Sequence, residues 1–408
     1  MKKVSFILST VCLTTVLTAQ IDNKQIKKDI GFLASDKLKG RGTSSPEEKL
    51  AANYIATSFS KSGLLPKGND GYQYHFSFKK NTNPHDTSII NIKERKGIDI
   101  IGYLDNGAVN TIVIGAHYDH LGLGHDHNSL DANPDNKIHN GADDNASGTA
   151  GVLELARYFS GNNKKEAYNF LFMCFSGEEL GLLGSKKWCD NPTIPIASIN
   201  YMINMDMIGR LNDSTKKLLV YGVGTSPSWV PLLDKTNTYF SIKKDSSGIG
   251  PSDQTSFYLK DIPVLHFFTG QHSDYHKPSD DVEKINFPGE QKVLEYIITL
   301  INELDSQPKL IFTKTASPTS TASTWKVSLG VMPDYAYEGQ GLRIDGVTNG
   351  KPASKAGLEI GDVVIELGDE KVNNMQDYMK ALSKLKKGDK TKVVIKRANE
   401  TITKDIEF

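Results

Sequence analysis

The chain has 408 residues, with 48 Lys and Arg against 48 Asp and Glu, so its formal net charge at pH 7 is zero. Because a single hydrophobic core rarely serves a chain of this length, we expect at least two domains. The balanced charge argues against nucleic acid or an anionic membrane surface as the main partner, since both attract proteins with a basic excess.

The N-terminal sequence MKKVSFILSTVCLTTVLTAQ combines two lysines, an apolar stretch and a small residue, Ala19. This pattern predicts a signal peptide over residues 1–19 and hence a periplasmic or secreted protein, and the apolar stretch is too short to span a bilayer comfortably. A lipid-anchor cysteine usually follows a small residue, whereas Cys12 follows Val11, so the sequence disfavours a lipoprotein. After removal of the signal, Cys174 and Cys189 are free to pair or to remain thiols, and we expect a buried thiol at Cys174.

Helical and strand-like stretches alternate through residues 20–305, which predicts an α/β domain with a mainly parallel, mixed sheet flanked by helices. Residues 306–324 are rich in Ser, Thr and Pro and predict a linker. Residues 325–408 alternate short strands and turns, with one helix near the end, and predict a second, small domain.

Ser45 as N-cap and Pro46 in the first turn begin one predicted helix, and GEQKVLEYIITLINELD closes the first domain with another. The predicted strands of this domain are SIINI (88–92), TIVIGAH (111–117), NFLFMCFS (169–176), INYMINMD (199–206), KLLVYG (217–222) and IPVLHFF (262–268).

Polar side chains interrupt these apolar runs where several strands end. In open α/β sheets, ligands bind beyond the carboxyl ends of the strands, so these positions are the first candidates for a site. In FSGEELGLLGS, an apolar strand leads into a turn that carries two adjacent glutamates. The candidates are His117, Asp119, His120, Asp143, Asp144, Glu178, Glu179, Asp206 and His276.

Imidazole and carboxylate groups are the ligands that zinc and similar divalent metals prefer. Each candidate alone has an ordinary explanation as a structural histidine, a helix cap or a turn residue. Together they favour a metal site. One catalytic zinc needs only three protein ligands. Because candidates lie at five separate strand ends, they indicate two metals that share a bridging carboxylate.

The ordered motifs GAHYDHLG, NGADDNASG, FSGEELGLLGS, NMDMIG, GPSDQTSF and YHKPSDD closely resemble the co-catalytic dizinc aminopeptidase family of the bacterial secreted leucyl aminopeptidase type. The resemblance extends over about residues 30–304. It implies a zinc exopeptidase fold, aminopeptidase activity and two zinc ions per chain. It assigns His117 and Asp206 to one zinc, Glu179 and His276 to the other, and Asp144 as the bridge.

The resemblance also implies that Glu178 is the general base that takes a proton from the attacking water. Asp119 would orient the imidazole of His117 through its second nitrogen, and Tyr275 would stabilise the oxyanion. Asp253 matches a supporting residue of the family, although a plain helix cap is an equal alternative. We interpret His120, His125, His127 and His139 as loop residues, because the metal ligands are already assigned.

Residues 325–408 resemble a PDZ domain of the bacterial protease-associated kind. In such domains a peptide C-terminus adds a strand to a sheet edge, and backbone N–H groups of a loop hold its carboxylate. SLGVM (328–332) matches this loop, so a protein C-terminal tail is expected at Leu329, Gly330 and Val331, with the helix MQDYMKALSKL as the other wall. The alternative is a structural appendage with an unused groove.

Three alternatives to the aminopeptidase prediction stay open. One is a PDZ-led peptide-binding protein that uses the peptidase domain as a scaffold. The others are a carboxypeptidase and a glutaminyl cyclase of the same fold. Cobalt or manganese also suits the ligand types, so the sequence does not fix the working metal.

Overall fold

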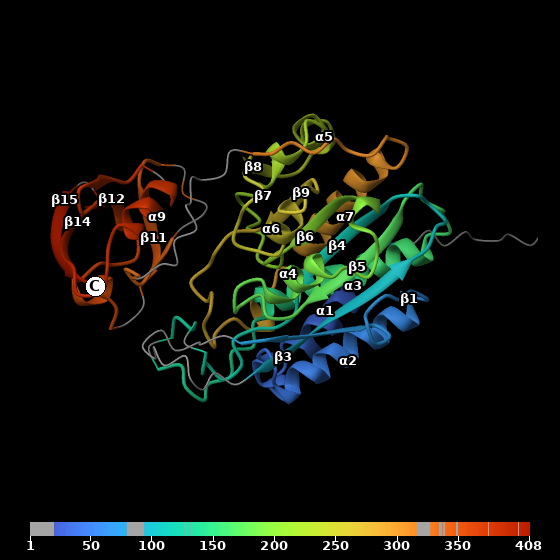
Figure 1. Ribbon diagram of the computed structural model, residues 1–408, viewed down its shortest axis with the longest axis horizontal. Coiled ribbons are helices and arrows are strands. Elements are labelled where there is room, and N and C mark those ends of the chain that lie inside the picture. Colours follow the sequence, from blue (N-terminus) through green and yellow to red (C-terminus); the bar gives the residue numbers. More distant parts are fainter. Residues whose placement is uncertain are drawn as a thin grey trace, which may run out of the picture.

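The computed structural model describes residues 20–79, 94–126, 128–131, 133–315, 327–333, 337, 339–347, 350–373, 375–398 and 400–408. The predicted signal peptide, the predicted strand at 88–92 and His127 lie outside these residues. The described chain forms two sheets (Figure 1). The hydrophobic cores of the two sheets are separate. Within these ranges, no helix has the length and apolar character needed to cross a membrane.

The first sheet has nine strands in the order β1-β3-β5-β4-β6-β9-β7-β8, with β2 paired to β3. The four central strands, β5, β4, β6 and β9, are parallel, and antiparallel pairs join them to β3 on one side and β7 on the other. This confirms the predicted mixed sheet. The strands are β1 (Leu65–Pro66), β2 (Gln73–Phe78), β3 (Arg95–Leu104), β4 (Thr111–His117), β5 (Asn169–Phe175), β6 (Ile199–Met205), β7 (Lys217–Tyr221), β8 (Ser241–Asp245) and β9 (Val264–Phe268).

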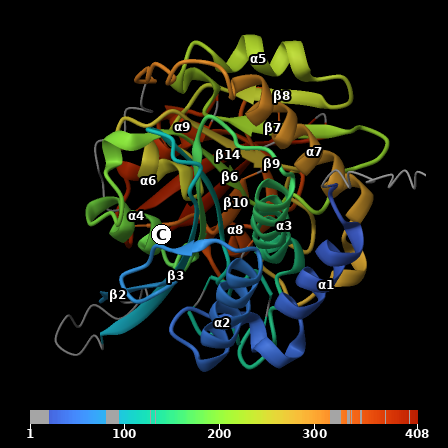
Figure 2. The same cartoon turned by 90° about the vertical axis from the view of Figure 1, so that its right-hand side faces the viewer.

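Helices cover both faces of this sheet (Figure 2). Helices α1, α2, α3, α5 and α7 pack on one face, and α4 and α6 pack on the other. Their bounds are α1 (Asn23–Leu33), α2 (Pro46–Lys61), α3 (Gly148–Gly161), α4 (Leu183–Asp190), α5 (Trp229–Thr236), α6 (Gln254–Tyr258) and α7 (Phe287–Leu304). At the start of α2, the hydroxyl of Ser45 accepts a hydrogen bond from the N–H of Glu48 at 3.0 Å, which confirms the predicted cap.

Strand β5 shows why the central strands lack an amphipathic pattern. Phe170, Phe172 and Cys174 belong to the core under α1, α2 and α3, whereas Leu171 and Met173 belong to the core under α4 and α6. Because successive side chains point to opposite faces and both faces are covered, every position of the strand is buried and every position after Asn169 is apolar. Cys174 and Cys189 are both buried free thiols.

The second sheet is antiparallel, in the order β10-β11-β12-β14-β15, with β13 paired to β12. Its core includes Leu329, Ile344, Val364 and Ile395, and it receives Tyr378 from α9. The elements are β10 (Val331–Pro333), β11 (Leu342–Val347), α8 (Pro352–Lys355), β12 (Val363–Leu367), β13 (Glu370–Lys371), α9 (Met375–Ser383), β14 (Lys390–Arg397) and β15 (Glu400–Glu407).

The predicted linker differs from the structure in its first part. Residues 309–315, which we call the strap, pack on the first domain: Leu310 is buried in its core and Phe312 lies against the core under α4 and α6. The N–H of Leu310 donates to Asn200 Oδ1 at 2.7 Å, and the N–H of Thr313 donates to the carbonyl of Thr225 at 2.8 Å. Two apolar side chains and several hydrogen bonds thus dock a segment whose composition otherwise indicates a linker. Residues 316–324 lie outside the described residues.

A chain that ends at residue 305 should therefore be less stable than one that ends at residue 315. Loss of the buried Leu310 side chain and of the strap's hydrogen bonds should lower the free energy of unfolding by about 3 kcal/mol. Chemical denaturation of the two truncated chains measures the difference. Equal midpoints and slopes would show that the strap contributes nothing to the first domain.

Candidate metal centre

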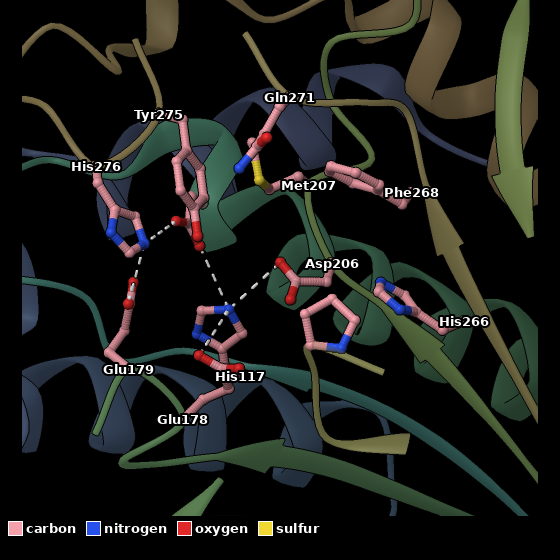
Figure 3. A pocket seen from close by; sticks show the side chains of 12 residues that line it. His117, Glu178, Glu179, Asp206, Met207, His266, Phe268, Gln271, Tyr275 and His276 are labelled. Carbon is pink, nitrogen blue, oxygen red and sulfur yellow. Dashed lines mark ion pairs between the residues drawn. The ribbon is translucent and has the colours of Figure 1, made fainter. Parts of the chain in front are cut away.

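The predicted site residues meet at the carboxyl edge of the parallel strands. His117 is the last residue of β4, Asp206 follows β6, and His276 lies in the loop after β9. Glu178 and Glu179 lie in the turn between β5 and α4, as expected. Asp144 comes from the segment Ala142–Ser147 that leads into α3, and its peptide bond to Asn145 is cis. Figure 3 shows the labelled side chains of His117, Glu179, Asp206 and His276 converging from separate elements.

Asp144 stands between two groups of ligand atoms. Its Oδ1 lies 3.4 Å from His117 Nε2, which also lies 3.4 Å from Asp206 Oδ1. Its Oδ2 lies 3.2 Å from His276 Nε2, which lies 3.1 Å from Glu179 Oε2. The two carboxylate oxygens of one residue therefore face two different imidazole–carboxylate pairs.

These distances suit zinc. Bonds of about 2.0–2.1 Å in a tetrahedral shell place neighbouring ligand atoms roughly 3.3 Å apart. Moreover, Asp144 Oδ2 is buried and has no hydrogen-bond partner among the described residues. Two groups of potential ligands, His117 with Asp144 and Asp206, and His120 with Asp144 and Glu179, meet the spacing for a metal ion. The residues present thus fit two cations that share Asp144.

The pKa values in the site reflect burial and close opposite charges. Burial lowers the pKa of His117 and His276, but the neighbouring carboxylates raise both by more, so that both end well above the usual range. Burial raises the pKa of Glu178, and the nearby negative charge of Glu179 adds to this. Burial also raises the pKa of Asp144, yet its contacts with the surrounding imidazoles bring it well below its usual range.

The turn that carries the two glutamates is held by three buried carboxylates beneath it. The N–H of Ser176 donates to Asp99 Oδ1 at 2.8 Å, its hydroxyl donates to Glu48, and the N–H of Glu178 donates to Asp119 Oδ1 at 3.2 Å. Burial raises the pKa of Glu48 to about 8. A Cβ at Gly184 would lie 2.1 Å from Asp99 Oδ1, so only glycine allows this approach.

Asp119 does not orient His117 in the expected way. His117 Nδ1 lies 3.1 Å from the backbone carbonyl oxygen of Asp119 but 3.8 Å from its carboxylate. The carboxylate accepts hydrogen bonds from the hydroxyl of Thr43 and from the N–H of Glu178. The residue therefore supports the imidazole through its main chain and the glutamate turn through its side chain.

His120 is not an ordinary loop residue. It is buried, and its Nδ1 lies 2.7 Å from Glu179 Oε1 and 3.9 Å from Asp144 Oδ2. His276 lies closer to Asp144 and contacts the other oxygen of Glu179, so we favour His276 as the ligand and His120 as the group that orients Glu179. His139 is buried and hydrogen-bonded at both nitrogens, and His125 is exposed in a loop.

Arg41 is a supporting residue that the sequence did not reveal. It is fully buried, and its guanidinium donates to the carbonyl oxygens of Tyr118 at 2.6 Å and Gly141 at 2.7 Å. These bonds join the end of β4 to the segment that carries Asp144. Burial lowers the pKa of Arg41 to about 10, so it remains charged.

Asp280 and His272 fix the same segment from the other side. Asp280 Oδ2 accepts hydrogen bonds from the N–H groups of Asp143 and Asp144, each at 3.0 Å. His272 Nε2 lies 3.1 Å from Asp143 Oδ2. The loop that carries His276 is therefore tied directly to the residue before Asp144.

Tyr275 stacks on His276, with ring centroids 3.9 Å apart, and lines the pocket above the ligands (Figure 3). The pocket continues past Asp206 to Met207, Pro251, His266, Phe268 and Gln271. Asp253 is the N-cap residue of α6, as the helix-cap alternative expects, but its side chain makes no capping hydrogen bond. It is fully buried, and burial raises its pKa to about 7.

Two family models match this chain. The model described as Peptidase family M28 matches residues 99–301, and a PDZ domain model matches residues 326–408.

Aminopeptidase YwaD of Bacillus subtilis (strain 168) is 27% identical over 245 residues, which cover 56% of this chain and 48% of that protein. Leupeptin-inactivating enzyme 1 of Streptomyces exfoliatus is 33% identical over 151 residues, 35% of this chain and 32% of that enzyme. The chain thus spans about half of the first relative's length and a third of the second's.

Among solved structures, BSAP, a zinc aminopeptidase from Bacillus subtilis, matches with a TM-score of 0.54 at 17% identity. The match covers 72% of this chain and 98% of the BSAP chain. Porphyromonas gingivalis glutaminyl cyclase has a TM-score of 0.55 at 17% identity, covering 70% of this chain and 99% of its own. At such identity these likenesses establish the fold alone.

Replacing His120 and His276 one at a time should show which histidine binds zinc and which one orients Glu179. We expect His276→Ala to retain about one zinc ion per chain after dialysis. His120→Ala should retain two, one of them bound roughly tenfold to a hundredfold more weakly. Elemental analysis and zinc titration measure both, and His120→Asn, which can replace the Nδ1 contact, is the control. The opposite pattern would make His120 the ligand.

Proposed function

Because the chain carries a peptidase family M28 domain followed by a PDZ domain, we propose that it is a zinc-dependent aminopeptidase that hydrolyses N-terminal residues from peptides. The observation that carries this proposal is the position of Asp144, whose two oxygens each face a separate imidazole–carboxylate pair. His117 and Asp206 would hold one zinc, Glu179 and His276 the other, and Asp144 would bridge them.

Two bound zinc ions would supply Lewis-acid activation of a water molecule and of the scissile carbonyl. Glu178 takes the proton from the attacking water at its carboxylate. Its Oε2 lies 4.0 Å from His117 Nε2, and the side chain lines the pocket beside the ligands. Glu178 then returns the proton to the departing amine.

Glu178 depends on neighbours that keep it in place. Its N–H is fixed by Asp119, and the preceding turn is fixed through Ser176. Tyr275 reaches into the pocket from the loop that carries His276, where its phenol donates a hydrogen bond to the oxyanion. Binding and proton transfer are thus assigned to different residues of the same pocket.

We further propose that residues 1–19 direct the protein to the periplasm or outside the cell. The peptidase domain would extend from residue 20 through the strap to 315, and the PDZ domain would cover 325–408. Leu329, Gly330 and Val331 would hold a protein C-terminal tail. The main-chain position of this loop is supported by a hydrogen bond from the N–H of Ala353 to the carbonyl of Leu329 at 2.8 Å, and Gly330 adopts a φ of +77°.

Zinc content tests the paired site. Purified protein should contain about two zinc ions per chain, chelation should abolish hydrolysis of an aminoacyl amide, and added zinc should restore it. One zinc with full activity would contradict the co-catalytic arrangement. Conversion of an N-terminal glutamine to pyroglutamate, without hydrolysis of other residues, would favour a cyclase.

The two adjacent glutamates should fail in different ways. Glu178→Gln keeps the shape of the side chain but removes the basic oxygen, so zinc should remain bound while kcat falls by about a hundredfold to ten-thousandfold. Glu179→Gln weakens a charged ligand, so one zinc should be lost or bound far more weakly, with lower thermal stability. Steady-state kinetics, elemental analysis and thermal unfolding distinguish them. Variants with identical defects would refute the separate roles.

A further inference from the structure

His266 is a buried histidine whose polar atoms the metal centre does not use. It lies on β9 and is 2% exposed, and neither ring nitrogen has a hydrogen-bond partner among the described residues. His139, which is equally buried, bonds the Ser129 hydroxyl with one ring nitrogen and the Lys137 carbonyl with the other. A buried histidine with a purely structural role is expected to have hydrogen-bond partners at its ring nitrogens, as His139 does.

The unpartnered nitrogens belong to a pocket wall. His266 lines the cavity that contains the metal ligands, and Figure 3 shows its imidazole on the side of Asp206 away from His276. Gln271 lines the same cavity, and its buried Oε1 also lacks a partner in the described chain. Two polar side chains with unused hydrogen-bonding capacity therefore lie in the wall of the cavity next to a proposed ligand.

The surroundings of His266 are otherwise apolar. Met207 and Phe268 line the pocket and belong to a small hydrophobic cluster with Leu219 and Tyr221. The ring of Tyr221, the residue opposite on β7, stacks on the His266 ring at 5.4 Å. Burial lowers the pKa of His266 to about 4, so the imidazole is neutral near pH 7 and presents one donor and one acceptor.

The geometry points to a selective subsite in the pocket beside Asp206, which receives the side chain of the substrate's N-terminal residue. At this subsite, His266 favours an uncharged side chain with a hydroxyl or carboxamide head over an apolar side chain of the same shape. This rests on the proposed aminopeptidase function. An apolar head leaves the polar atoms of His266 and Gln271 without hydrogen bonds, whereas a hydroxyl or carboxamide can satisfy them. A charged head would lose its hydration against Met207 and Phe268.

Near-isosteric pairs of aminoacyl p-nitroanilides, Asn against Leu and Thr against Val, test this in the zinc-loaded full chain. We expect wild-type kcat/KM to favour the polar member of each pair. His266→Phe, which keeps a ring but removes both nitrogens, should lower the polar-to-apolar ratio by about tenfold or more. His266→Gln, which keeps a donor and an acceptor, should largely preserve it. His125→Phe, the same change at an exposed histidine, should leave the ratio unaltered.

Calorimetric binding of free L-Asn and L-Leu provides a readout that does not depend on turnover. Preferred binding of L-Asn that His266→Phe abolishes would support the subsite, even if no substrate is hydrolysed, in which case the aminopeptidase function alone is overturned. Hydrolysis with a ratio that favours the apolar members and is unchanged in His266→Phe overturns the subsite alone. Absence of both binding and turnover overturns both.

Discussion

Asp144, Glu178, Glu179 and Asp206 share one largely buried pocket, and carboxylates at such distances repel one another unless positive charge lies among them. Imidazolium groups or divalent cations can supply that charge. The raised pKa values of His117 and His276 have the same cause, because the surrounding carboxylates favour the protonated imidazoles. The positions of the strands, the turn and the loops around the pocket all serve to hold these groups together despite their repulsion.

The means of holding them is mainly the polypeptide backbone. Asp280 binds two consecutive N–H groups at Asp144, Asp119 binds the N–H of Glu178, and Arg41 binds carbonyl groups on two segments. Main-chain groups fixed in this way cannot rotate as side chains do. The points from which the site side chains project are therefore positioned before any ligand arrives, which limits the reorganisation needed during a reaction.

The fold class and the central residues of the site were predictable because they depend on local patterns. His117, Glu179 and Asp206 interrupt or follow apolar runs, and β4, β5 and β6 are buried along their whole length and mostly apolar because both sheet faces are covered. The strand β3 was not predicted, since its sequence RKGIDIIGYL mixes charged residues and glycines with the apolar positions.

The supporting residues were missed for a different reason. Arg41 lies 100 residues before Gly141, whose carbonyl it binds, and nothing in the sequence around it indicates burial. Glu48 has the spacing of a helix-capping glutamate, and only the three-dimensional structure shows that it also binds Ser176 on the turn before the glutamates. The sequence predicts a loop role for His120 because other residues already account for the ligands, but a metal ligand also needs groups that orient it, and His120 contacts Glu179.

The strap has a consequence for how the two domains can cooperate. Because residues 309–315 are bound to the first domain, only the eleven residues 316–326 separate Thr315 from Val327, the next described position. A segment of this length spans at most about 40 Å even when fully extended. Any polypeptide held by the second domain is thereby confined to a small volume around the first, and its local concentration there is set by the tether and not by the bulk solution.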